Sequence, residues 1–143
     1  MNTELRDELA AWCASYVTAF SAYDSSGVAD HWLFPALITQ EGRTLLFKDR
    51  DKFDANTRSL LSFYSKQGVA RAERTLVEAM AMNEDNASMR VEDRMVREDG
   101  AVIVSWEAAY VLTRTRKGWR AVLAAADGEM DAWKARGTPL GRG

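Results

Sequence analysis

The chain has 143 residues, of which 47% are hydrophobic and 28% are charged, and its formal net charge at pH 7 is −2. A domain of this length buries enough apolar surface to fold without metals or disulfides, and its basic residues are too scattered to form a nucleic-acid-binding stripe. No apolar run reaches the roughly 20 residues of a membrane span, and the single cysteine, Cys13, excludes an internal disulfide. We therefore expect one globular domain over residues 1–136, a flexible tail over residues 137–143, and no nucleic-acid or membrane partner.

The first part of the chain is predicted to be helical. Apolar residues recur at helical spacing over residues 3–23. Asp24 to Gly27 interrupts this pattern and is suited to cap a short second helix that ends near Trp32, before Pro35 prevents its continuation. Because the first residues are acidic and helically periodic, unlike a secretion signal, we expect a cytoplasmic protein.

A small hairpin and a third helix follow. Residues 36–40 and 44–47 favour two short strands on either side of a glycine-containing turn. Asp49 or Asp51 is suited to begin a helix that ends near Gly68. The sequence therefore places three helices before the main run of strands.

The second half of the chain predicts an antiparallel meander. Residues 71–83 favour a helix by propensity, but we interpret them as a strand because residues 87–95 alternate strictly between apolar and polar and need a neighbour. A turn at residues 98–100 leads into a long hairpin over residues 101–127 with one almost wholly apolar face. A short helix over residues 129–136 completes the prediction.

Four motifs in this order resemble the nuclear transport factor 2-like superfamily, which includes ketosteroid isomerase and polyketide cyclases. They are Tyr16-Val17-x-Ala19-x-x-Ala22-x-Asp24-x-x-Gly27-Val28, Phe34-Pro35-Ala36, Glu107-x-x-Tyr110-Val111-Leu112 and Gly118-Trp119-Arg120. The resemblance covers nearly the whole chain and implies a cystatin-like α+β cone. In this fold, three N-terminal helices pack in the concave face of a strongly curved mixed or antiparallel sheet, around a pocket at the open end. It also implies a homodimer formed through the sheet, but it leaves function open, because some members have no catalysis.

Comparison with ketosteroid isomerase implies specific positions for the pocket residues. Tyr16 falls where that enzyme has its oxyanion tyrosine, and Tyr110 falls at the position of the second oxyanion donor. The general-base position is Gln40, whose amide has no useful basicity, so the usual proton abstraction is not available. Leu123, Ala125 and Asp127 fall on positions that line the pocket in such enzymes, with Asp127 in place of an apolar side chain.

The role of Asp127 depends on the register of the long hairpin. A loop of two or four residues places Tyr110 opposite Leu123 and Trp106 opposite Asp127, which puts this acid on the apolar face, where its pKa would rise. A three-residue loop ending at Gly118 places it on the other face. The simplest alternative is that Asp127 ends the last strand and caps the terminal helix.

Other reactive side chains have simpler interpretations. His31 has no evident orienting partner, so we interpret it as a surface or packing residue, and Cys13 lies on the apolar stripe of the first helix. Asp93 alternates onto an apolar face, where Arg94 or a strand edge would satisfy it. Because the chain has neither a His/Cys cluster nor a glycine-rich phosphate loop, we expect no metal and no cofactor.

Two hypotheses for function follow. The first is a small-molecule-binding protein without assigned catalytic residues, whose aromatic pocket encloses a mostly apolar organic ligand. Its predicted ligand-binding residues are Trp12, Tyr16, Trp32, Trp106, Tyr110 and Asp127. The second is an isomerase, cyclase or dehydratase acting next to a carbonyl, with Tyr16 and Tyr110 as oxyanion donors and Asp127 as acid or base. A dimerisation or regulatory module with a filled interior is a third alternative.

Overall fold

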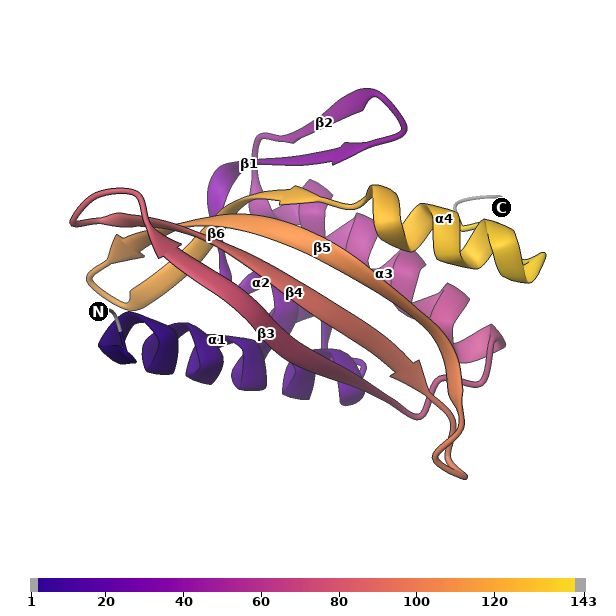
Figure 1. Cartoon of the computed structure of the whole chain (residues 1–143). Helices are drawn as coiled ribbons and strands as arrows, with labels where there is room; N and C mark the ends of the chain where they lie inside the picture. The colour runs from indigo at the N-terminus through magenta and orange to yellow at the C-terminus, as the bar shows by residue number, and fades with distance from the viewer. Residues whose placement is uncertain (1–2, 141–143) are drawn as a thin grey trace.

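The computed structural model describes residues 3–140, which form four helices and one six-stranded sheet (Figure 1). In chain order the elements are α1 (Thr3–Ser21), α2 (Ser25–Ala29), β1 (Trp32–Gln40), β2 (Arg43–Phe47), α3 (Arg50–Lys66), β3 (Arg71–Ala81), β4 (Asn86–Val96), β5 (Val102–Thr115), β6 (Gly118–Ala125) and α4 (Asp127–Arg136). The strand order is β2-β1-β6-β5-β4-β3, and the sheet is mixed because β1 pairs in parallel with β6. The predicted cystatin-like α+β class is therefore confirmed.

The long strands of the meander bend over the helices (Figure 1). Helix α1 packs along β3, α2 lies between α1 and α3, and α4 lies along β5. The buried stripe of α1 includes Leu5, Leu9, Trp12 and Tyr16, at the spacing that turns one helical face toward the sheet. The interior of the protein therefore lies between the concave side of the sheet and the first three helices.

The ambiguous segment after α3 is a strand, as predicted. β3 pairs with β4 over most of its length, and this pairing overrides the helix propensity of its Glu, Ala and Met residues. The prediction that the second helix ends near Trp32 is wrong, because α2 ends at Ala29 and Trp32 already belongs to β1. The peptide bond between Phe34 and Pro35 is cis, inside this longer strand.

The hairpin of β5 and β6 has a two-residue loop, but its register differs from the predicted one. Thr115 pairs with Gly118 across the loop, yet the register shifts by one residue at Val122. Such a bulge adds one residue to a single strand and turns the following side chains to the opposite face. Tyr110 therefore lies opposite Ala124 instead of Leu123.

The convex face of the sheet carries a network of charged side chains. Arg94 pairs with Glu73 and Glu92 at 3.5 and 2.9 Å, and Arg90 pairs with Glu78 and Glu107 at 3.5 and 3.1 Å. Opposite-charge pairs across neighbouring strands stabilise a solvated sheet face modestly. None of the helices in residues 3–140 has the length and apolarity needed to span a bilayer.

The chain continues past α4 against the body of the protein. The backbone N–H of Thr138 donates to the carbonyl of Trp133 at 3.0 Å, and Leu140 packs on the core. Thr138 and Leu140, in the first part of the segment predicted as a tail, therefore contact the rest of the protein. Residues 141–143 of that segment lie outside the described residues.

Candidate functional site

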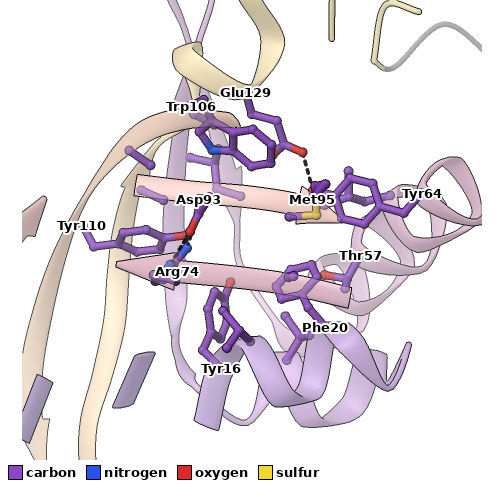
Figure 2. Close-up of a pocket in the computed structure, with 18 of the residues that line it drawn as sticks. Tyr16, Phe20, Thr57, Tyr64, Arg74, Asp93, Met95, Trp106, Tyr110 and Glu129 are labelled. Atoms are coloured by element: carbon purple, nitrogen blue, oxygen red, sulfur yellow. Dashed lines mark hydrogen bonds and ion pairs between the residues drawn. The ribbon is translucent and has the colours of Figure 1, made fainter. Parts of the chain in front are cut away.

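A cavity of about 90 Å³ lies between the concave face of the sheet and helices α1, α3 and α4 (Figure 2). Its wall is largely aromatic and includes Tyr16, Phe20, Trp32, Tyr64, Trp106 and Tyr110. Small side chains of the sheet leave this space open, among them Ala72, Ala108 and Ala124. An apolar cavity with a few polar groups is the usual form of a small-molecule site.

An ion pair is buried at the inner end of this cavity. Arg74 on β3 lies directly opposite Asp93 on β4, and the Nε and Nη2 atoms of Arg74 contact the two carboxylate oxygens at 2.6 and 2.8 Å. The two side chains are only 4% and 7% exposed. A bidentate geometry offsets the cost of removing both charges from water. The pair therefore adds polarity to the cavity without adding net charge.

Two tyrosines lie beside this pair, as Figure 2 shows. Arg74 Nη2 donates to the hydroxyl oxygen of Tyr110 at 2.9 Å, and Trp32 Nε1 donates to that of Tyr16 at 2.9 Å. The guanidinium carbon of Arg74 lies 4.7 Å from the centre of the Tyr110 ring and 5.2 Å from that of Tyr16, within cation–π range. Each hydroxyl accepts a hydrogen bond, and neither hydroxyl hydrogen has an acceptor among residues 3–140.

Both tyrosines remain neutral donors at ordinary pH. Burial raises the pKa of Tyr16 well above its usual value and also raises that of Tyr110, where the neighbouring Arg74 opposes the effect. One nitrogen of Arg74, Nη1, is also buried without a partner among the described residues. The inner end of the cavity therefore has hydrogen-bond donors without acceptors.

Glu129, in the first turn of α4, lies at the opposite side of the cavity (Figure 2). Its Oε2 atom accepts one hydrogen bond from the Tyr64 hydroxyl and a second one from Trp133 Nε1 at 3.2 Å. Burial raises the pKa of Glu129 to about 7, and these two hydrogen bonds only partly oppose that rise. A carboxyl group with this pKa is suited to accept and return a proton near neutral pH.

Gly128 allows α4 to lie close enough to β5 for Glu129 to reach the cavity. A Cβ atom at Gly128 would fall well inside van der Waals contact with the backbone carbonyl oxygen of Glu107. Any residue with a side chain would therefore force the helix away from the sheet. The start of α4 is also held by Asp127, whose Oδ1 accepts the backbone N–H of Glu41 at 2.6 Å.

Four of the six predicted ligand-binding residues line the cavity, namely Tyr16, Trp32, Trp106 and Tyr110. Trp12 stacks on the Tyr16 ring at 4.8 Å between ring centres, but it does not line the cavity. Asp127 lies outside it, exposed at the start of α4. The predicted register with Trp106 opposite Asp127 is wrong, because β6 ends at Ala125 after the bulge.

Two charged residues of the cavity were not identified from the sequence. The inward position of Arg74 could have been predicted, because an extended strand puts it on the same face as Ala72 and Leu76. For Asp93 the sequence suggested Arg94 or a strand edge, but Arg94 faces outward and β4 is not an edge strand. Glu129 carried no usable signal, because an acidic residue in the first turn of a helix is ordinary and usually solvated.

A wider groove of about 660 Å³ lies outside the cavity. It is bounded by α3, α4 and residues 138–140, and Gln40, at the predicted general-base position, lies here. Five residues line both spaces: Ile38, Asn56, Leu60, Ala126 and Glu129. The cavity and the groove therefore meet at Glu129.

A family model described as "NTF2-like protein (DUF6841)" matches residues 7–129. No curated protein matches the chain in sequence.

Several solved structures share the fold. A ketosteroid isomerase-like protein from Erwinia carotovora atroseptica is 18% identical with a TM-score of 0.64, over 87% of this chain and 95% of that one. A cystatin-like domain of unknown function from Nostoc punctiforme is 20% identical with a TM-score of 0.69, over 87% and 77%. An NTF-2 like protein of unknown function from Shewanella oneidensis is 9% identical with a TM-score of 0.66, over 84% and 96%. At these identities the similarity establishes the fold alone.

Proposed function

The chain belongs to the NTF2-like family DUF6841, and we propose that it binds a small neutral organic molecule through an acceptor oxygen held at the inner end of the cavity. The observation that carries this proposal is the pair of buried phenols. Tyr16 and Tyr110 each accept one hydrogen bond, from Trp32 and Arg74, and each retains a hydroxyl hydrogen without an acceptor in residues 3–140. A ligand carbonyl oxygen supplies that missing acceptor.

The charges around the cavity favour a neutral ligand over an anion. Asp93 already neutralises Arg74, so a bound carboxylate would leave an uncompensated charge in a desolvated site. Glu129 would add repulsion whenever it is ionised. A ketone, aldehyde or ester receives the same hydrogen bonds without this cost.

Ligand titration tests the proposal with three molecules of similar size: cyclopentanone, its hydrocarbon analogue methylenecyclopentane, and butyrate. We expect cyclopentanone to bind most tightly and to shift the NMR signal of the Trp32 indole N–H, which donates to Tyr16. Tyr16→Phe and Tyr110→Phe should each weaken binding about fivefold to tenfold, the worth of a typical hydrogen bond. Tyr23→Phe is the matched control, because the Tyr23 hydroxyl donates to the carbonyl of Val69 and does not line the cavity. Equal binding of the ketone and the hydrocarbon would overturn the proposal.

A second candidate function is proton transfer next to the bound carbonyl, as in an isomerase, cyclase or dehydratase. The observation that favours it is the pKa of Glu129, about 7, at a carboxyl group that faces the cavity. In this mechanism Glu129 removes a proton from the carbon next to the carbonyl, the phenols stabilise the enolate oxygen, and Glu129 returns the proton. Glu129 thus takes the role that the sequence suggested for Asp127.

Exchange of the α-hydrogens of cyclopentanone in heavy water measures this reaction directly. We expect the protein-catalysed rate to rise as the pH passes about 7, with the ionisation of Glu129. Glu129→Gln should lower that rate about 100-fold or more, the usual contribution of a positioned base. Asp127→Asn is the control for removing a nearby acid, and a rate that responds to Asp127 but not to Glu129 would exclude this mechanism.

A further inference from the structure

The groove outside the cavity has the dimensions and lining of a second binding compartment. Its volume of about 660 Å³ far exceeds the 90 Å³ of the inner cavity. Most of its exposed wall is apolar, and the large apolar side chains in it come from β1, α3, α4 and the C-terminal segment, namely Ile38, Leu60, Phe63, Met130 and Leu140. Polar residues such as Gln40, Lys66 and Gln67 also line it.

The inner cavity is too small for a large ligand on its own. For comparison, an enclosed apolar cavity of about 150 Å³ binds benzene, whereas the 90 Å³ here adjoin the groove, so they take a carbonyl group with a few neighbouring carbons but not a long chain. The side where Ile38, Asn56 and Glu129 line both spaces is where the rest of such a molecule can pass from the cavity into the groove. The groove begins at that point.

Resting on the proposed function, we infer that the groove holds the apolar chain of the ligand whose carbonyl occupies the cavity. The ligand class is an elongated, neutral carbonyl compound with an alkyl chain, bound with its oxygen toward Tyr16 and Tyr110. Its chain passes Glu129 and lies between α3 and α4. The carbonyl gives orientation, and burial of the chain supplies most of the affinity.

A series of methyl alkyl ketones of increasing chain length tests this inference by calorimetric titration. Each added methylene buried in the groove should raise the affinity about threefold to fourfold. Longer members should also shift the NMR signal of the Trp133 indole N–H, which donates to Glu129 at the junction. Butanone, the shortest member, should leave that signal nearly unchanged while it shifts that of Trp32.

Ser59→Trp fills the groove, because Ser59 lines it from the exposed side of α3 and does not line the inner cavity. Ser65→Trp is the matched control, since Ser65 is exposed on the same helix but lines neither space. We expect the gain per methylene to disappear in Ser59→Trp and to persist in Ser65→Trp, with butanone binding equally to both variants.

The outcomes separate this inference from the proposed function. If butanone binds and depends on Tyr16 and Tyr110, but longer chains gain nothing or gain equally in Ser59→Trp, the groove inference is wrong and the cavity proposal stands. If a plain alkane binds as tightly as the ketone of equal length, the groove is an independent apolar site and the shared ligand is excluded. If no ketone binds, both proposals fail.

Discussion

At the scale of single residues, the buried Arg74–Asp93 pair determines the polarity of the cavity. Arg74 donates hydrogen bonds to both Asp93 and Tyr110, so it links β3, at the edge of the sheet, to β4 and β5. Removing one member of such a pair leaves an uncompensated charge in a desolvated site, whereas removing both leaves none. The losses in unfolding free energy caused by the two single substitutions therefore do not add up in the double variant.

We therefore predict that Arg74→Met lowers the free energy of unfolding by about 3–5 kcal/mol. The double variant Arg74→Met/Asp93→Leu should recover most of that loss, because no buried charge remains. Chemical denaturation measures both effects. Arg90→Met, which breaks exposed pairs on the convex face, is the control and should cost no more than about 1 kcal/mol. A double variant as unstable as the sum of its single variants would contradict this account.

The raised pKa of Glu129 predicts that the stability of the protein depends on pH. Because burial raises its pKa from 4.5 to about 7, the folded protein keeps this proton up to a higher pH than the unfolded chain does. Between these two pH values the unfolded state binds fewer protons, so the contribution of Glu129 to stability falls as pH rises. The full loss above neutral pH is at most about 3 kcal/mol and is smaller to the extent that water reaches the half-buried carboxyl.

The measurement is the difference in unfolding free energy between Glu129→Gln and the wild type across this range. Relative to the wild type, the variant should gain stability as pH rises from about 4.5 to about 7 and change little beyond that. Taking the difference cancels the other carboxyl groups, including Glu8 and Glu73, whose pKa values are lowered by hydrogen bonds to Trp119 and Arg71 respectively. A flat difference curve would show that Glu129 ionises normally in the folded protein.

At the scale of secondary structure, α4 controls access to the cavity. It brings Glu129 to the junction with the groove, and its position depends on close contact between Gly128 and the backbone of β5 at Glu107. Tyr64 on α3 holds Glu129 from the other side. A small displacement of this helix would therefore change both the chemistry and the opening of the site.

Gly128→Ala tests the role of this contact. We predict a loss of about 1–3 kcal/mol in unfolding free energy, typical of overpacking, together with a shifted NMR signal for the Trp133 indole N–H and a lower pKa for Glu129 as water enters. Asp131→Ala, an exposed change on the same helix, is the control and should leave the Trp133 signal in place. An unchanged Trp133 signal in Gly128→Ala would mean that α4 does not depend on this contact.

At the scale of the whole molecule, the convex face of the sheet is the surface through which the resemblance predicts a homodimer. This face carries ion pairs of Arg90 and Arg94 with Glu73, Glu78, Glu92 and Glu107. A dimer built on such a face gains specificity and association rate from charge more than it gains affinity from apolar burial. We therefore expect it to be weak and sensitive to salt.

Sedimentation velocity at low salt and at about 0.5 M NaCl tests this prediction, because the higher salt screens exposed charges over a few ångströms. We expect a dimer at low salt that dissociates at high salt. Arg94→Glu, which reverses one charge of the network, should dissociate it at low salt as well. A monomer under all conditions would contradict the predicted homodimer.

Most of the fold was predictable from the sequence because its signals are local. The alternation of residues 87–95 and the helical stripe of α1 each arise within one segment, where neighbouring side chains show which face is buried. The aromatic wall was predictable for a related reason. Tyr16, Trp32, Trp106 and Tyr110 are large apolar residues on faces that must be buried in any version of this fold.

The polar half of the site depended on contacts between distant segments. Val122 looks like any strand residue, yet the bulge there shifts the register and ends the strand before Asp127. The sequence by itself therefore determined the fold class and the apolar lining of the cavity, because burial follows from residue type and spacing. Only the tertiary structure decided that Arg74 neutralises Asp93 and that Glu129 faces the cavity, because the environment of a charged group is set by segments that sequence spacing does not bring together.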